Sequence, residues 1–181
     1  MDALSNVLRT MHLTGGVFLH AEFFDPWCLS VKALPQSCAP YLGGTAEVIP
    51  YHFVLEGRMR VRIANSDDFE MEPGESVLFP RNDLHLLGSD LGRTPVDAQT
   101  VIQRSPNGMI ATIVFGGNGP ATRIVCGFLG GEALFRNPIV NALPAVLRLD
   151  TRRSSAADWI ASTFRHAAGP RTRVNGHLTI A

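Results

Sequence analysis

Two stretches between residues 51 and 85 decide the fold: Tyr51-His52-Phe53-Val54-Leu55-Glu56-Gly57 and Glu72-Pro73-Gly74-Glu75-Ser76-Val77-Leu78-Phe79-Pro80-Arg81-Asn82-Asp83-Leu84-His85. Each joins an apolar run to turn residues, and each carries a histidine. Successive side chains of a strand point to opposite faces, so His52 and Val54 share one face while Tyr51 and Phe53 share the other. We therefore predict short strands ended by tight turns, with His52 and His85 directed at a common interior.

The same pattern of short apolar runs and turn residues extends over residues 16–128. Turn signals such as Asp25-Pro26, Pro73-Gly74 and Pro106-Asn107-Gly108 separate the runs. The predicted strands cover residues 17–23, 28–33, 48–55, 59–64, 76–79, 84–87, 96–102, 109–115 and 122–128. Many short strands spaced in this way are typical of a sandwich or barrel, so we expect one mainly β, antiparallel barrel or jelly roll.

Helices are predicted at both ends of the chain. An apolar stripe at helical spacing predicts a short helix over residues 2–13. Beyond Gly130-Gly131 the pattern predicts a helix over residues 138–147 and a second one from Ser154-Ser155 to about residue 169. We accordingly divide the chain into a ligand-binding domain over residues 1–150 and a C-terminal helix and tail over residues 151–181, which would serve in dimerisation or as a linker.

Composition excludes several classes of protein. The chain has 181 residues, 45% of them hydrophobic and 18% charged, which suits one folded domain rather than a disordered chain. Formal net charge is zero, so no general attraction to DNA or an acidic membrane is expected. No apolar run is long enough to span a bilayer. Three cysteines without a CxxC pair, and no visible leader sequence, favour a reducing cytoplasm.

Four residues are candidates for binding a molecule in the interior: His52, Val54, His85 and Trp27. The two histidines could be satisfied by backbone groups or water, could contact an organic ligand, or could bind a metal. With Cys126 they would leave room for zinc, and a water would complete the coordination. Trp27 follows a proline and is either a packing residue or one wall of a pocket. We find no nucleophile–base pair and no phosphate-binding loop.

The pattern Gly74-x5-Pro80-x-Asn82-x2-His85 resembles the second motif of the cupin superfamily, with Asn82 where that motif usually has glycine. The segment ending Val54-Leu55-Glu56-Gly57 is similar to the end of the first motif. Metal-binding cupins carry His-x-His and then Glu upstream of that glycine, whereas residues 43–50 here contain no histidine. The resemblance therefore implies the cupin fold without the usual metal ligands, of which only His85 is present.

Over residues 1–165 the chain resembles the cupin-type N-terminal ligand-binding domain of AraC-family transcription regulators. The matching segments include residues 2–8, Pro26-Trp27, residues 52–57, residues 73–85, Val125-Cys126-Gly127-Phe128 and Asn137-Pro138-Ile139-Val140. The resemblance implies an effector-sensing, often dimerising module that binds a small molecule in the barrel. DNA would be contacted only through a further domain, for which this chain has no room, so we expect either part of a regulator or a stand-alone domain.

From this resemblance we expect no enzymatic activity and no cofactor. The alternatives are a divalent metal such as zinc bound by His52, His85 and Cys126, a metal-dependent cupin enzyme such as an oxygenase or isomerase, and a stand-alone binding domain. The expected partners are a small-molecule effector and a second copy of the chain. No interaction with a membrane is expected.

Overall fold

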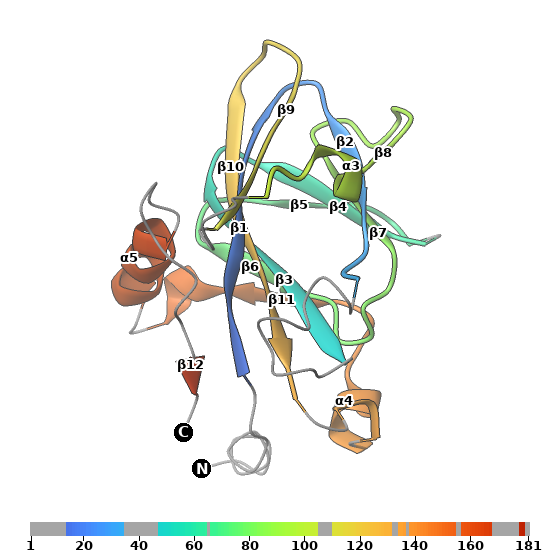
Figure 1. Ribbon diagram of the computed structural model, residues 1–181, viewed down its shortest axis with the longest axis vertical. Helices are drawn as coiled ribbons and strands as arrows, with labels where there is room; N and C mark the ends of the chain where they lie inside the picture. The colour runs from blue at the N-terminus through green and yellow to red at the C-terminus, as the bar shows by residue number, and fades with distance from the viewer. Residues whose placement is uncertain are drawn as a thin grey trace.

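Two β-sheets packed face to face make up the body of the protein in this computed structural model (Figure 1). The structure describes residues 14–34, 47–64, 66–104, 110–131, 134–136, 138–154, 157–167 and 178–179. The sheets do not close into a continuous barrel, and the arrangement is that of a jelly roll. The predicted mainly β fold is confirmed.

The larger sheet has the strand order β11-β6-β3-β10-β1-β12, with β9 pairing β1 in parallel. Its strands are β1 (Thr14–Phe24), β3 (Val48–Glu56), β6 (Glu75–Leu78), β9 (Ala111–Gly116), β10 (Ala121–Gly130), β11 (Leu147–Asp150) and β12 (Leu178–Thr179). The smaller sheet has the order β5-β4-β7-β2-β8. Its strands are β2 (Cys28–Val31), β4 (Met59–Ile63), β5 (Phe69–Met71), β7 (His85–Gly88) and β8 (Val96–Asp97).

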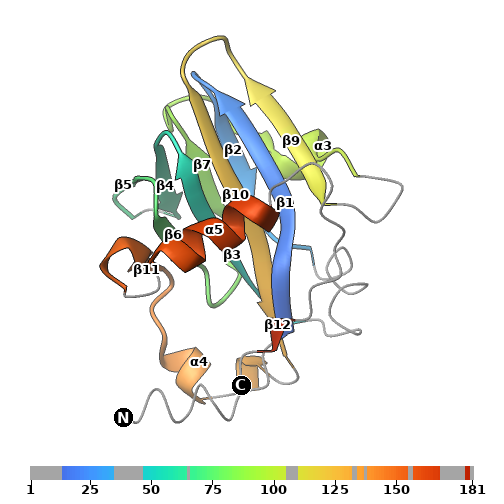
Figure 2. The same cartoon turned by 90° about the vertical axis from the view of Figure 1, so that its left-hand side faces the viewer.

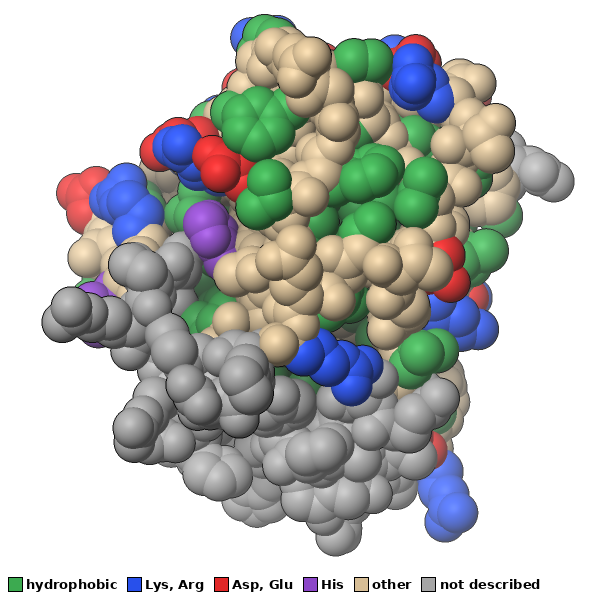
Figure 3. Space-filling model, turned by 45° about the horizontal axis from the view of Figure 1, so that its top comes forward, with side chains coloured by type: hydrophobic (Ala, Val, Ile, Leu, Met, Phe, Trp, Pro, Cys, Tyr) green, Lys and Arg blue, Asp and Glu red, His purple; other side chains and the backbone are tan. Residues whose placement is uncertain are grey.

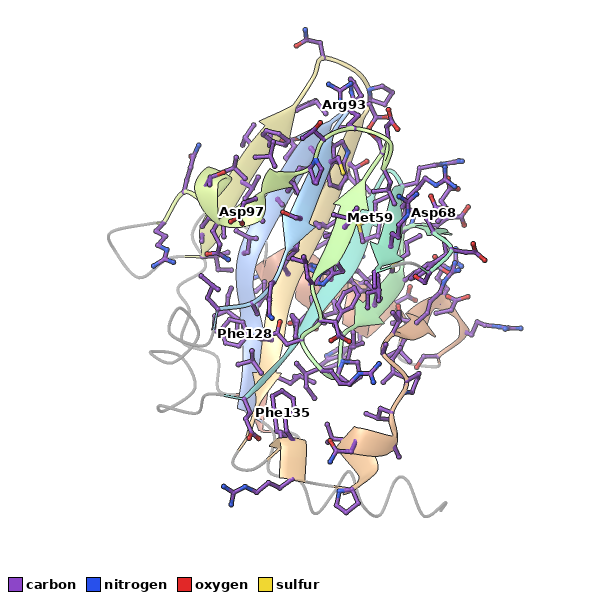
Figure 4. All side chains as sticks on the ribbon, turned by 90° about the vertical axis from the view of Figure 1, so that its right-hand side faces the viewer. Met59, Asp68, Arg93, Asp97, Phe128 and Phe135 are labelled. Carbon is purple, nitrogen blue, oxygen red and sulfur yellow. The ribbon has the colours of Figure 1, made fainter. Side chains whose placement is uncertain are left out.

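The hydrophobic core lies between the two sheets and follows from strand alternation. In β3 the side chain of Val54 is fully buried in this core, together with Leu29 and Leu87 of the smaller sheet and Ile124 of β10. Figure 4 shows side chains from both sheets filling the space between them. Burial of large apolar side chains on both inner faces is what holds the two sheets together.

Helix α5 (Ala157–Ala167) lies across the outer face of the larger sheet (Figure 2). Its Phe164 ring stacks on Phe53 of β3, with centroids 4.4 Å apart, and tilts against Tyr51 at 6.0 Å. The outward direction of Tyr51 and Phe53 is the one that alternation predicts. The other helical elements are α3 (Ala98–Val101), η2 (Leu134–Arg136), α4 (Pro138–Ala142) and η3 (Thr151–Arg153). None of the described helices is long and apolar enough to cross a bilayer.

Residues 147–153 dock on the turn before β6 through a buried carboxylate. Glu75 is only 4% exposed, and its oxygens accept hydrogen bonds from Arg148 at 2.8 and 3.0 Å and from Arg152 at 3.4 Å. Thr151 adds two bonds to the carbonyl oxygen of Gly74, from its amide and its hydroxyl. Ion pairs and hydrogen bonds to the backbone thus fix the segment leading to α5 to the larger sheet.

Several predicted elements need correction. The strand predicted over residues 96–102 stops at Asp97, because the Asp97 carboxylate accepts the amide of Gln99 and starts α3. The helix predicted over residues 138–147 ends at Ala142, and β11 follows it. Strand β5 was not predicted. The helix predicted over residues 2–13 lies outside the described residues, and the boundary at residue 150 stays a prediction.

Candidate functional site

A cavity of about 180 Å³ lies between the two sheets, and its walls are mainly apolar. Its lining includes Phe18, Leu19, Phe23, Leu29, Val31, Leu87, Ile102, Ile113, Ile124 and Phe128. Two of the lining residues between the sheets, His52 and Cys126, are polar. Hydrophobic side chains also reach the surface at the end of the molecule that faces the viewer in Figure 3, with charged groups around them. A concave, mainly apolar space with few polar groups is the usual form of a small-molecule site.

His52 and Cys126 come together because their strands pair directly. Cys126 of β10 stands opposite His52 of β3 in the antiparallel register, and the Cys126 Sγ lies 2.9 Å from the His52 Nδ1. His85 belongs to β7 of the other sheet, yet its Nε2 lies 2.9 Å from the Nε2 of His52. The contact between the histidines therefore bridges the two sheets across the core.

The Asp83 carbonyl determines which group donates in each hydrogen bond between Cys126, His52 and His85. The Nδ1 of His85 lies 2.9 Å from the backbone oxygen of Asp83, which can only accept, so this nitrogen carries the proton. The Nε2 of neutral His85 then accepts from the Nε2–H of His52. The remaining Nδ1 of His52 accepts from the thiol of Cys126. We call this sequence of bonds, from Cys126 through His52 and His85 to the Asp83 carbonyl, the polar chain.

Burial keeps the polar chain uncharged. Burial lowers the pKa of His52 well below its usual value, and the nearby His85 lowers it further. Burial also lowers the pKa of His85 to about 4, although the bond to the Asp83 carbonyl opposes that shift. The pKa of the Cys126 thiol is raised by burial. At neutral pH both imidazoles are neutral and the thiol keeps its proton, which is the protonation state that the hydrogen bonds require.

Aromatic rings fix the orientation of the two histidines. The ring of Phe79 stacks on His85 with centroids 3.6 Å apart and planes 9° apart, and it meets His52 edge-on at 5.7 Å. Phe79 is itself fully buried. Neither imidazole can therefore turn away from its partner without displacing a core side chain.

A metal ion does not fit the polar chain as it stands. His52 contacts His85 with one ring nitrogen and Cys126 with the other, so the two partners lie on opposite sides of its ring. One ion cannot be bound by all three without a rearrangement of these side chains. Within the described part of the chain, no group of three His, Cys, Asp or Glu residues could hold a metal. The zinc site predicted from His52, His85 and Cys126 stays a prediction that this geometry does not favour.

The other predicted site residues lie behind the cavity wall. His85 touches the cavity residue His52 but is not itself part of the described lining. Val54 and Trp27 are buried in the core, where Trp27 stacks on Phe23 at 3.9 Å. The packing interpretation of Trp27 is thus the one that the geometry supports, and its place in a ligand site stays untested.

The cavity also has lining residues that the sequence analysis missed. Lys32 follows β2, Gln99 lies on α3, and Arg104 comes shortly before β9. The side-chain amide of Gln99 donates to the Lys32 backbone oxygen at 3.5 Å, which joins α3 to the end of β2. Their signal in the sequence was weak, because none of the three lies in a strand, so alternation does not fix the direction of its side chain.

Asn82 holds this same edge of the cavity. Its amide makes two bonds to the backbone of Ala33, accepting from the Ala33 amide at 3.0 Å and donating to the Ala33 oxygen at 2.8 Å. The Asn82 backbone is left-handed, with φ of 52°. Asparagine tolerates that conformation better than most residues, which explains its place where the cupin motif usually has glycine.

A family model described as Cupin matches residues 2–174 of the chain. No curated protein sequence matches it. Two solved structures of ToxT from Vibrio cholerae are similar: wild-type ToxT of strain SCE256 with a bound unsaturated fatty acid, at 12% identity and a TM-score of 0.39, and ToxT at 1.65 Å resolution, at 8% identity and a TM-score of 0.40. Each match covers 84% of this chain and 47% of ToxT, so the chain spans about half the length of those proteins.

Proposed function

The chain belongs to the cupin family, and from this membership we propose that it is the effector-sensing domain of an AraC-type transcription regulator. It would bind a small, largely apolar molecule between its sheets and transmit that event to its C-terminal segment. The observation that carries the proposal is the position of β3. This strand directs His52 into the cavity and Phe53 outward onto α5.

The cavity supports the binding half of this proposal. Its volume of about 180 Å³ and its mostly apolar lining suit a compact organic molecule whose surface is largely removed from water. The inner polar groups already bind one another, so a ligand gains little from hydrogen bonds there. Affinity would come chiefly from burying apolar surface, at roughly 25 cal/mol per Å².

The contact between β3 and α5 supports the sensing half. A ligand against His52 that shifts β3 slightly would change how Phe53 and Tyr51 meet Phe164 on the other side of the sheet. Sensing requires only that the ligand bind one arrangement of β3 and α5 more tightly than another. A regulator would read that difference through whatever is attached beyond α5.

The partners follow from the same proposal. DNA would be contacted through a separate domain, and the cytoplasm would be the working compartment. We also propose a homodimer, because Trp159 of α5 is 65% exposed and Leu149 of β11 is 47% exposed. Large exposed apolar side chains in one segment favour an interface. Light scattering that gave the monomer mass at high micromolar concentration would contradict the dimer.

A ligand screen followed by hydrogen exchange tests the proposed function. Thermal-shift screening of small metabolites should yield a compound that raises the midpoint, and the same compound should change exchange over residues 157–167. Ala98→Leu and Ala111→Leu, which fill the cavity from α3 and β9, should abolish both effects. A hit that still binds both filled variants, or that leaves α5 unchanged, would count against sensing through β3.

A further inference from the structure

Charge is distributed unevenly over the cavity wall. Lys32 and Arg104 are the two charged residues in the described lining, and both side chains are exposed at the cavity edge. No carboxylate belongs to that lining. The nearby Asp97 has its Oδ1 engaged with the Gln99 amide at 2.9 Å, at the start of α3. Lys32 and Arg104 thus bring two positive charges to the cavity mouth, beside the Asp97 carboxylate and next to an uncharged interior.

Among the described lining residues, none in the interior carries a charge that would hold a charged part of a ligand. The polar chain satisfies its own donors and acceptors: Cys126 donates to His52, His52 donates to His85, and His85 donates to a backbone carbonyl. Burying an ion beside these neutral groups would cost several kcal/mol without a partner. An anionic group on a ligand would therefore stay at the mouth, and an apolar body would enter.

The size of the cavity limits that body. About 180 Å³ is close to the roughly 150 Å³ apolar cavity that holds a benzene molecule in another protein. One wall presents the stacked rings of Phe18 and Phe128, whose centroids are 3.7 Å apart. A single aromatic ring fits such a space, whereas a long acyl chain such as that of palmitate has about twice the heavy atoms of benzoate and exceeds it.

We propose that the cavity binds a compact aromatic monoanion, with its ring against the Phe18–Phe128 wall and its anionic group at the mouth between Lys32 and Arg104. This proposal rests on the proposed function and narrows it to a class of ligand. The proposal specifies only the charge and size of the ligand, so other anions of the same size should bind in the same way.

Three probes of similar size and different charge test the class of ligand: benzoate, benzyl alcohol and benzylamine. Calorimetry at low ionic strength should show benzoate binding about fivefold more tightly than benzyl alcohol, with benzylamine weakest, because two exposed cations contribute modestly. The preference should shrink as salt is raised. Equal affinities, or a preference for benzylamine, would overturn the proposal and leave binding in the cavity intact.

Variants of the two charged residues test whether the preference for benzoate arises at the cavity mouth. Lys32→Gln and Arg104→Gln should each reduce benzoate affinity while leaving benzyl alcohol unchanged. Arg93→Gln is the matched control, because Arg93 is exposed at the other end of the barrel from Phe128 (Figure 4) and does not line the cavity. A loss in Arg93→Gln equal to that in Lys32→Gln would show a general charge effect and overturn the assignment.

Two further outcomes separate this proposal from the function it rests on. Palmitate binding more tightly than benzoate would overturn the size limit but keep a sensor for apolar acids. If none of the three probes bound while a neutral compound from the screen did, and Ala98→Leu blocked that compound, the anion class would be wrong and the cavity would remain the effector site.

Discussion

The ring of Phe164 in helix α5 stacks on the ring of Phe53 in β3, with planes 23° apart, and Phe53 is the chain neighbour of the cavity residue His52. One strand thus contacts the cavity with one face and the C-terminal helix with the other. Because His52 and Phe53 are joined by one peptide bond, a displacement of His52 would reach Phe53 without any intermediate element.

Phe164→Ala should release α5 from the sheet. The side chain is only partly buried, so we expect a loss of about 1–2 kcal/mol in the free energy of unfolding, below the cost of deleting a fully buried phenylalanine. Urea unfolding measures it. Trp159→Ala on the exposed side of α5 should cost less than about 0.5 kcal/mol in the monomer. Equal losses in the two variants would show that the stacking does not anchor the helix.

Removing the thiol at the start of the polar chain should be costlier than replacing it by a hydroxyl. Cys126→Ala leaves the Nδ1 of buried His52 without a donor, at a cost of about 1–3 kcal/mol. Cys126→Ser restores a donor at the same place and should be the more stable of the two in denaturant titrations. If alanine were the more stable replacement, the thiol would not be the donor to His52.

Acid should destabilise the protein through His85. Its folded pKa of about 4 lies below the ordinary value of 6.5, so between these pH values the unfolded chain binds a proton that the folded chain does not. The contribution of neutral His85 to the free energy of unfolding is therefore fully present above pH 6.5. It is lost as the pH is lowered toward 4, by on the order of 3 kcal/mol. Denaturant titrations from pH 7.5 to 4 measure the slope. His85→Gln should make the slope shallower without abolishing it, because burial also lowers the pKa of His52, and an unchanged slope would contradict a neutral, buried His85.

Neutralising Glu75 should loosen the segment that leads to α5. Glu75→Gln removes the charge that Arg148 and Arg152 share, and we expect a loss of about 2 kcal/mol, since one partner is buried while the arginines remain half-exposed. Limited proteolysis should then cut within residues 147–153. Glu70→Gln is the control, because its ion pair with Arg58 is exposed and is worth less than about 1 kcal/mol.

Metal analysis addresses the alternative of a metal-dependent cupin enzyme. We expect the purified protein to contain no stoichiometric Zn, Fe or Mn, and added Zn²⁺ to leave the thermal midpoint unchanged, because His52 uses both ring nitrogens within the protein. Stoichiometric metal that disappears in His85→Ala would contradict this expectation. It would require the polar chain to rearrange around the ion.

Much of the fold was predictable because local patterns determine it. Alternation in β3 and β10 and the turns around them predicted both strands and the opposite directions of His52 and Phe53. Strand β11 was missed because its sequence Leu-Arg-Leu-Asp has no buried face of its own, and its conformation depends on pairing with β6. The short β5 likewise depends on its pairing with β4.

The candidate site was predictable only in part. The two histidines could be directed to one interior from alternation, but their roles depended on the register of strands distant in sequence. Register places Cys126 opposite His52, and the packing of two sheets brings His85 to the other nitrogen. The sequence suggested ligands for a metal or an effector, whereas the three side chains satisfy one another.

Asn82 acts on the cavity although it does not line it. Its side-chain amide offers Ala33 one donor and one acceptor, as a neighbouring β-strand would, at a point where the chain has left β2. Lys32 is the residue directly before Ala33, so its backbone position depends on that amide. A glycine at residue 82 would keep the turn and lose this support. The edge of the cavity is therefore supported by a residue of the fold-defining motif, so a substitution at residue 82 would change the shape of that edge without replacing any lining residue.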